Sequence, residues 1–183
     1  MIYFDLDGVI RDISVVLFGG DPKEWGSKVK SGENVFDFIN NNLNVLVEAP
    51  VTDFYRFRDY KIECILSCQP VRWRFYTNQW IDKFCPGVDV VRYVRKPEDK
   101  LSILKNGDFL VEDYPFFSDY SKIILVRRPY NMCVVNPFAE VFTWRDLNSL
   151  VGNKGKVLSD ETKRKMSVSH KLFWKEKKCA SSL

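Results

Sequence analysis

The stretch Ile2–Asp12, IYFDLDGVIRD, places two carboxylates directly after a run of β-type residues. Its three apolar residues predict a buried strand that ends at an acidic loop. If the extended backbone continues to residue 7, the two-residue period turns Asp5 and Asp7 to the same side. Two like charges so close are costly unless a cation lies between them or one carboxylate keeps its proton. The stretch therefore predicts a chemical site, with an ordinary turn after a strand as the alternative.

The composition is that of a folded domain. The chain has 183 residues, 45% hydrophobic and 15% aromatic, which is enough for one α/β domain with an insertion. No run approaches the roughly 20 apolar residues that cross a bilayer, and the start lacks the features of a signal peptide. We therefore expect a soluble, cytoplasmic protein without a membrane partner. The five cysteines form no CxxC pair, and the single histidine argues further against zinc.

The net charge of +4 is unevenly distributed along the chain. Residues 152–178 contain nine basic and three acidic residues, an excess of six positive charges. The rest of the chain carries 19 basic and 21 acidic residues, a net charge of −2. The sequence therefore divides into a main domain, residues 1–150, and a basic C-terminal tail, residues 151–183.

The segment from residue 13 to residue 60 predicts a small helical insertion after the first strand. It is broken by the string Gly19-Gly20-Asp21-Pro22 and by two later glycines. The apolar residues of Val35–Leu46 then recur at helical spacing, and a second short helix is predicted within Val51–Tyr60.

Beyond the insertion, strands alternate with helices, as in a parallel sheet flanked by helices. The predicted strands are Lys61–Leu66, Val88–Val94, Asp108–Asp113 and Ser121–Val126, with an edge strand within residues 131–142. The predicted helices are Val71–Phe84, a short one after Lys100, and a last one from Thr143 to Val151. Ser67 follows a strand just before a helix, where a hydroxyl and free N–H groups suit a phosphate. Capping of that helix by Ser67 or Gln69 is the alternative.

The string DLDGVIRD resembles the first motif of the haloacid dehalogenase (HAD) superfamily of aspartate-nucleophile phosphatases. Ser67 resembles the second motif of that family, a lysine after the third strand resembles the third, and Glu112-Asp113 resembles the fourth. The resemblance covers about residues 1–130. It implies an α/β, Rossmann-like HAD fold whose central parallel sheet is flanked by helices, with a small helical cap at about residues 13–60.

The resemblance also implies roles for the motif residues. Asp5 would be nucleophile and ligand of Mg²⁺, and Asp7 would be the acid and base, with its backbone carbonyl on the metal. Asp113 would be a further metal ligand, with Glu112 behind it and Asp119 as a weaker candidate. Ser67 and Lys100 would bind the phosphate, although Lys96 competes with Lys100 for this role. An ammonium group suits it because a point charge needs no bidentate geometry.

The expected function is that of a Mg²⁺-dependent phosphatase acting through an aspartyl phosphate. The motif spacing is most similar to that of 5′-nucleotidases, which implies a small phosphorylated substrate, a (deoxy)nucleoside monophosphate, and is compatible with a phage source. A phosphatase acting on nucleic acid ends is one alternative, and a non-catalytic DNA-binding protein on a HAD scaffold is another. For a phage protein, the cytoplasm would be that of the host.

The tail contains GKVLSDETKRKMSVSHK, which resembles the nuclease-associated modular DNA-binding motif. That resemblance implies contacts with nucleic acid phosphates from Lys163, Arg164, Lys165 and Lys171. A solvated basic tail explains the same charges equally well.

Overall fold

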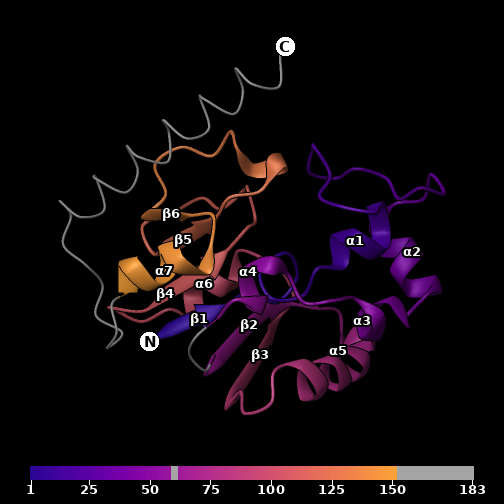
Figure 1. Cartoon of the computed structure of the whole chain (residues 1–183), viewed down its shortest axis with the longest axis horizontal. Helices are drawn as coiled ribbons and strands as arrows, with labels where there is room; N and C mark the ends of the chain where they lie inside the picture. The colour runs from indigo at the N-terminus through magenta and orange to yellow at the C-terminus, as the bar shows by residue number, and fades with distance from the viewer. Residues whose placement is uncertain (59–61, 152–183) are drawn as a thin grey trace.

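The computed structural model describes residues 1–58 and 62–151, and six parallel strands form its centre. The strands are β1 (Ile2–Phe4), β2 (Cys64–Cys68), β3 (Val90–Val94), β4 (Phe109–Glu112), β5 (Ile123–Val126) and β6 (Ala139–Val141). Their order is β3-β2-β1-β4-β5-β6, with every neighbouring pair parallel (Figure 1). This is the order of doubly wound, Rossmann-like sheets, in which the winding reverses between β1 and β4. The predicted α/β class and parallel sheet are confirmed.

Helices cover both faces of the sheet. They are α1 (Ile13–Phe18), α2 (Val35–Asn41), α3 (Val45–Glu48), α4 (Asp53–Arg56), α5 (Val71–Phe84), α6 (Asp99–Ile103), α7 (Trp144–Val151) and the 3-10 helix η1 (Pro129–Asn131). Helices α4, α5 and α7 bury apolar residues against one face, and α6 packs on the other. Among the described residues, no helix is both long and apolar enough to cross a membrane.

The insertion, residues 13–58, carries α1 to α4 between β1 and β2. Its side chains form a small apolar cluster separate from the two clusters on the sheet, in which Leu17, Ile39 and Leu46 pack with Trp73 of α5. In Figure 1, α1, α2 and α3 lie together to the right of the sheet. The predicted helical insertion is therefore present, and α5 is the element that joins it to the sheet.

Several predicted bounds in and near the insertion are wrong in detail. The run Val35–Leu46 is two helices, because the Asn42 side chain donates to the Phe38 carbonyl and competes with the helical ladder. Helix α1 was not predicted, since its β-branched residues have low helix propensity and hide the signal of the Asp12 cap. Strand β2, predicted as Lys61–Leu66, is Cys64–Cys68, because pairing with β3 continues to Cys68. Ser67 therefore lies within the strand and does not follow it.

The backbone turns directly after β1, before the second carboxylate. The N–H groups of Ile10 and Arg11 both donate to the Leu6 carbonyl, so the chain coils there instead of remaining extended. The strand therefore does not continue to Asp7, and strand alternation is not what brings Asp5 and Asp7 to one volume.

Candidate active site

Three buried carboxylates meet at the carboxyl ends of two neighbouring strands. Asp5 follows β1, while Glu112 and Asp113 lie at the end of β4. One oxygen from each lies within 4.8 Å of the others, and all three residues are buried. The predicted convergence of Asp5 and Asp113 is therefore observed. It lies at the switch point of the sheet, where ligands of this fold class bind.

Lys100 of α6 supplies a positive charge to this cluster. Its Nζ lies 2.7 Å from Asp5 Oδ1 and 2.5 Å from Glu112 Oε2, and the residue is only 2% exposed. Burial alone would lower the pKa of Lys100, but the Asp5 and Glu112 carboxylates outweigh burial and raise it. Lys96, the competing candidate, lies exposed on the surface. Of the two lysines, the structure brings Lys100 to the carboxylates.

The three carboxylates differ in the partners they already have. Glu112 Oε2 accepts from Lys100, and its Oε1 accepts from the backbone N–H groups of Asp113 and Tyr114 at 3.0 and 3.3 Å. Asp5 Oδ1 is buried and receives no hydrogen bond within the described part of the chain, although the Lys100 ammonium is at ion-pair distance. Oxygen ligands suit Mg²⁺. Asp5 and Asp113 therefore fit a metal, whereas Glu112 holds Lys100 and the backbone in place.

The cluster holds more negative charge than Lys100 neutralises. Burial, followed by the nearby Glu112 carboxylate, raises the pKa of Asp5 well above its usual range. Burial and then the Asp5 carboxylate raise the pKa of Asp113 to about 6. Such shifts mark carboxylates that are unfavourable when ionised without a further cation.

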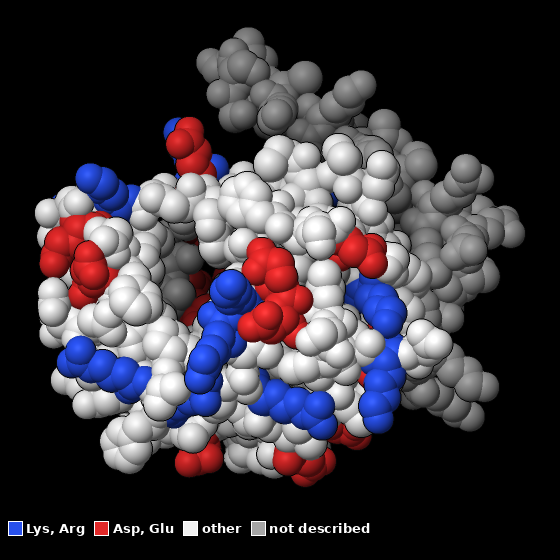
Figure 2. Space-filling view, turned by 180° about the vertical axis from the view of Figure 1, so that it is seen from behind, with Lys and Arg blue, Asp and Glu red and all other residues white. Residues whose placement is uncertain are grey.

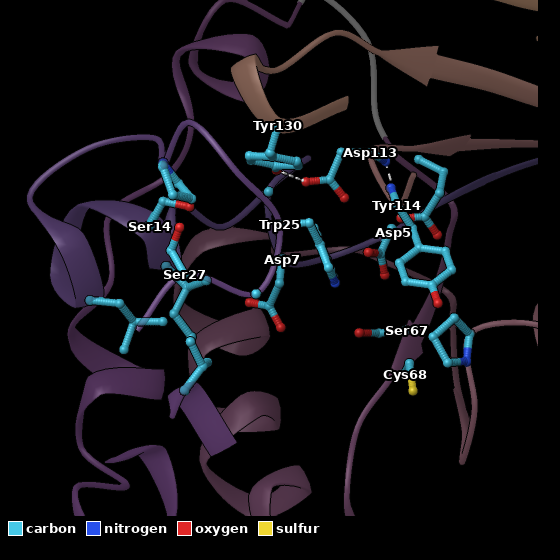
Figure 3. A pocket seen from close by; sticks show the side chains of 18 of the residues that line it. Asp5, Asp7, Ser14, Trp25, Ser27, Ser67, Cys68, Asp113, Tyr114 and Tyr130 are labelled. Atoms are coloured by element: carbon cyan, nitrogen blue, oxygen red, sulfur yellow. Dashed lines mark hydrogen bonds between the residues drawn. The ribbon is translucent and has the colours of Figure 1, made fainter. Parts of the chain in front are cut away.

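Tyr130 and Asn131 of η1 hold Asp113 in place. The Tyr130 hydroxyl donates to Asp113 Oδ2 (Figure 3). The Asn131 amide donates to the backbone carbonyls of Asp113 and Val126, at 2.9 and 2.8 Å. Sequence analysis missed both residues, because they lie in a loop that follows the last recognised motif. The string Pro129-Tyr130-Asn131, two residues after a buried strand, is the signal that could have found them.

Gly8 allows Asp113 to approach the first motif. Its φ is +82°, and a Cβ at this position would lie 1.8 Å from Asp113 Oδ2. Any other residue would therefore displace the carboxylate as well as strain the backbone. The glycine of DLDG makes room for a residue more than 100 positions later in the chain.

Asp7 faces a different set of partners. Its carboxylate is paired with Arg11, from Nε to Oδ1 at 2.6 Å and from Nη2 to Oδ2 at 3.0 Å. Gln69 Nε2 also donates to Oδ2 at 2.5 Å. The side chain of Asp7 is not one of the three clustered carboxylates, so a metal role for Asp7 is left to its backbone carbonyl.

A cavity of about 360 Å³ joins these groups. It is lined by all five residues predicted for the catalytic, phosphate and metal roles, namely Asp5, Asp7, Ser67, Lys100 and Asp113. Residues of the insertion form its opposite wall, among them Leu17, Phe18, Trp25 and Ile39. Figure 3 shows Trp25 reaching toward the carboxylates, and its ring centroid lies 5.4 Å from that of Tyr130. Figure 2, which views the molecule from behind Figure 1, shows a hollow with acidic side chains visible inside it.

Other predicted residues lie elsewhere. Asp119 is on the surface, where it accepts from the N–H and hydroxyl of Ser121. The predicted DNA contacts Lys163, Arg164, Lys165 and Lys171 lie outside the described residues. A scan against models of known protein families and a search of curated proteins each found no match. Support for a function therefore comes from the side chains at the sheet edge.

Proposed function

We propose that this chain is a HAD-type, Mg²⁺-dependent phosphatase that hydrolyses a small phosphate monoester through an aspartyl phosphate on Asp5. One observation carries the proposal: Asp5, Lys100 and Asp113 reach the same buried edge from three separate segments of the chain. Their order along the sequence also follows the resemblance of DLDGVIRD and its later motifs to that superfamily. Asp5 and Asp113 would hold the metal through side-chain oxygens.

Charge neutralisation explains why these groups belong together. An anionic nucleophile and a phosphate dianion repel each other, and Mg²⁺, when bound, offsets that repulsion. Lys100 lies beside the Asp5 carboxylate and can also donate to a phosphate oxygen. Ser67 lines the same cavity and offers a hydroxyl donor.

The reaction would then proceed in two steps. Asp7 enters the first step protonated. An oxygen of Asp5 attacks phosphorus, the bond from phosphorus to the ester oxygen breaks, and Asp7 gives its proton to the leaving oxygen. In the second step, a water molecule attacks the aspartyl phosphate while Asp7 takes its proton. Inorganic phosphate leaves, and both carboxylates return to their starting state.

The lining of the cavity favours a substrate with one phosphoryl group and an uncharged leaving group. Among the described residues that line it, Lys100 is the one cationic side chain. The wall formed by the insertion is mainly apolar and aromatic, which suits a flat ring better than a sugar with many hydroxyl groups. A (deoxy)nucleoside monophosphate meets both conditions, and the insertion would act as the cap over it.

The test is a Mg²⁺-dependent phosphatase screen over nucleoside monophosphates, sugar phosphates and end-phosphorylated oligonucleotides. We expect phosphate release from a monophosphate and its loss in Asp5→Asn, which removes the charge of the nucleophile with little change in volume. Asp119→Asn is the matched control, since that carboxylate lies on the surface, and it should leave the rate unchanged. If Asp5→Asn keeps more than about a tenth of the rate, the activation barrier has risen by less than roughly 1.4 kcal/mol. That result would exclude Asp5 as nucleophile.

A further inference from the structure

Arg11 contacts the proposed acid and base, yet the two chemical steps above give it no part. Its side chain is 0% exposed although it carries a full positive charge. A buried charge is tolerated only where partners match its charge and its donors. The partners of Arg11 therefore show what the residue holds together.

On one side, the Arg11 guanidinium donates two parallel hydrogen bonds to Asp7, from Nε and from Nη2. A planar fork that meets both carboxylate oxygens fixes the orientation of the carboxylate as well as its position. The Asp7 side chain is still 26% exposed and lines the cavity. Within the described residues its Oδ1 accepts one hydrogen bond, whereas a carboxylate oxygen can accept two. Asp7 can therefore meet a substrate oxygen while Arg11 holds it.

On the other side, the same guanidinium reaches the insertion and α5. Its Nη1 donates to the Leu46 carbonyl in α3 at 2.8 Å and to the Thr77 hydroxyl in α5 at 3.4 Å. Its carbon Cζ lies 5.6 Å from the centre of the Trp80 ring. One side chain thus joins the first motif, the insertion and the main helix beneath the insertion.

A second chain of hydrogen bonds closes a ring on the same carboxylate. The Thr77 hydroxyl donates to Gln69 Oε1 at 3.2 Å, and Gln69 Nε2 donates to Asp7 Oδ2. Asp7 is therefore oriented by donors from two directions, and both donor residues contact Thr77. A ring of this kind restricts Asp7 more than a single exposed ion pair would.

We infer that Arg11 is a positioning residue: it fixes the Asp7 carboxylate toward the cavity and ties that orientation to α3 of the insertion. This inference rests on the proposed function, in which Asp7 exchanges a proton with the leaving oxygen. Lysine at position 11 keeps the charge but cannot reproduce the fork, so the placement of Asp7 would be lost while its charge partner remains.

The experiment compares Arg11→Lys, Asp7→Asn and the double variant on two substrates. The leaving group of p-nitrophenyl phosphate departs as a stable anion, whereas that of a nucleoside 5′-monophosphate needs a proton. We expect Arg11→Lys to lower kcat for the nucleotide about 10- to 100-fold, with little change in KM and a much smaller loss on p-nitrophenyl phosphate. In the Asp7→Asn background, the same change should cause no further loss, because Arg11 acts through Asp7.

Arg127→Lys is the matched control, since Arg127 is also buried and paired with a carboxylate, Glu140. It should show no dependence on the leaving group. A Mg²⁺-dependent rise in the thermal midpoint shows that each variant has kept its folded acidic cluster. If Arg11→Lys does not fold, Arg11→Gln carries the test, because its amide can still donate to the Leu46 carbonyl.

Two results would overturn the role of Arg11 alone: equal losses on both substrates, or a loss in the Asp7→Asn background as large as in the wild type. Unchanged nucleotide turnover in Asp7→Asn would instead remove the acid and base role of Asp7 from the proposed function, and the role of Arg11 with it. If Asp7→Asn loses nucleotide turnover and Arg11→Lys does not, the role of Arg11 fails while the role of Asp7 stands.

Discussion

The carboxylates of Asp5 and Asp7 lie close in sequence, but the charges and donors that surround them are opposite in kind. Asp5 lies among two other acids with one ammonium between them, and burial raises its pKa. Asp7 lies in a bidentate pair with a guanidinium and accepts a further amide donor. Asp5 and Asp7 are separated by Leu6 alone, yet Asp5 lies in an excess of negative charge and Asp7 lies in a matched ion pair.

The difference shows how one motif can carry two chemical roles. A carboxylate crowded by like charges gains most from a metal cation, whereas a carboxylate held by a planar donor keeps a fixed direction. The surroundings of Asp5 come from segments far along the chain, Lys100 and Asp113. Asp7 is held by Arg11, four residues away, and by the more distant Gln69. A substitution that alters the surroundings of one carboxylate should therefore affect that carboxylate and leave the other unchanged.

Gly8→Ala should have the largest effect on the Asp5 side. The new Cβ would overlap Asp113 Oδ2, so the variant should lose roughly 100-fold in Mg²⁺ affinity, by the scale of changes next to metal ligands. Isothermal titration with Mg²⁺ measures the loss. Gly107→Ala is the control, because Gly107 has a φ of +83° and a Cβ there meets nothing within 4 Å. Equal losses in both variants would assign the effect to backbone strain instead.

A pH series tests the ionisation of the carboxylates around Asp5. The pKa of Asp113 rises from 3.8 unfolded to about 6 folded, so its contribution to stability is full below pH 4 and is lost as the pH rises through 6. That loss is roughly 3 kcal/mol, and Mg²⁺ should offset it because the metal binds the ionised form. The Mg²⁺-induced rise in thermal midpoint should therefore grow between pH 5 and pH 7. In Asp113→Asn, the growth should become smaller, and the remainder comes from Asp5, whose pKa burial also raises; unchanged growth would show that Asp113 is not responsible.

Tyr130→Phe should have the smallest effect. It removes the hydroxyl that donates to Asp113 Oδ2 but keeps the ring beside Trp25. Loss of one hydrogen bond to a charged group is worth about 1.5–3 kcal/mol at most, and we expect roughly a 10-fold weaker affinity for Mg²⁺. Tyr93→Phe, whose hydroxyl donates to Asn78 on the surface, should leave the affinity unchanged. An unchanged affinity in Tyr130→Phe would show that Asp113 does not depend on this donor.

Much of the sheet could be predicted from the sequence because its strands are short, apolar and separated by clear breaks. The helix Val71–Phe84 was predicted with the bounds that the structure has, since proline marks its start and apolar spacing runs to its end. The bounds within the insertion were less accurate, because asparagines and β-branched residues there oppose the helical signal. Those residues act through side-chain contacts that a periodic pattern does not contain.

The candidate site was predictable where a residue directly follows a strand. Asp5 and Asp113 belong to this class, whereas Ser67 lies within β2, one residue before its end, and lines the same cavity. Arg11, Gln69 and Tyr130 were assigned no role at the site because their contacts arise from the turn after β1, from the junction of β2 with α5 and from η1. The choice between Lys96 and Lys100 likewise needed the packing of α6, which buries only the latter.

The pairing of β1 with β4 has a consequence for synthesis on the ribosome. Ile2 pairs with Phe109, so β1 waits for a partner made 107 residues later. Contacts so distant in the chain form slowly, and β1 stays without that neighbour while the chain between is being made. The repulsion between Asp5 and Asp113 can therefore arise only after residue 113 has been made, when Lys100 is already present. The two carboxylates thus meet only when the lysine that offsets their charge is present.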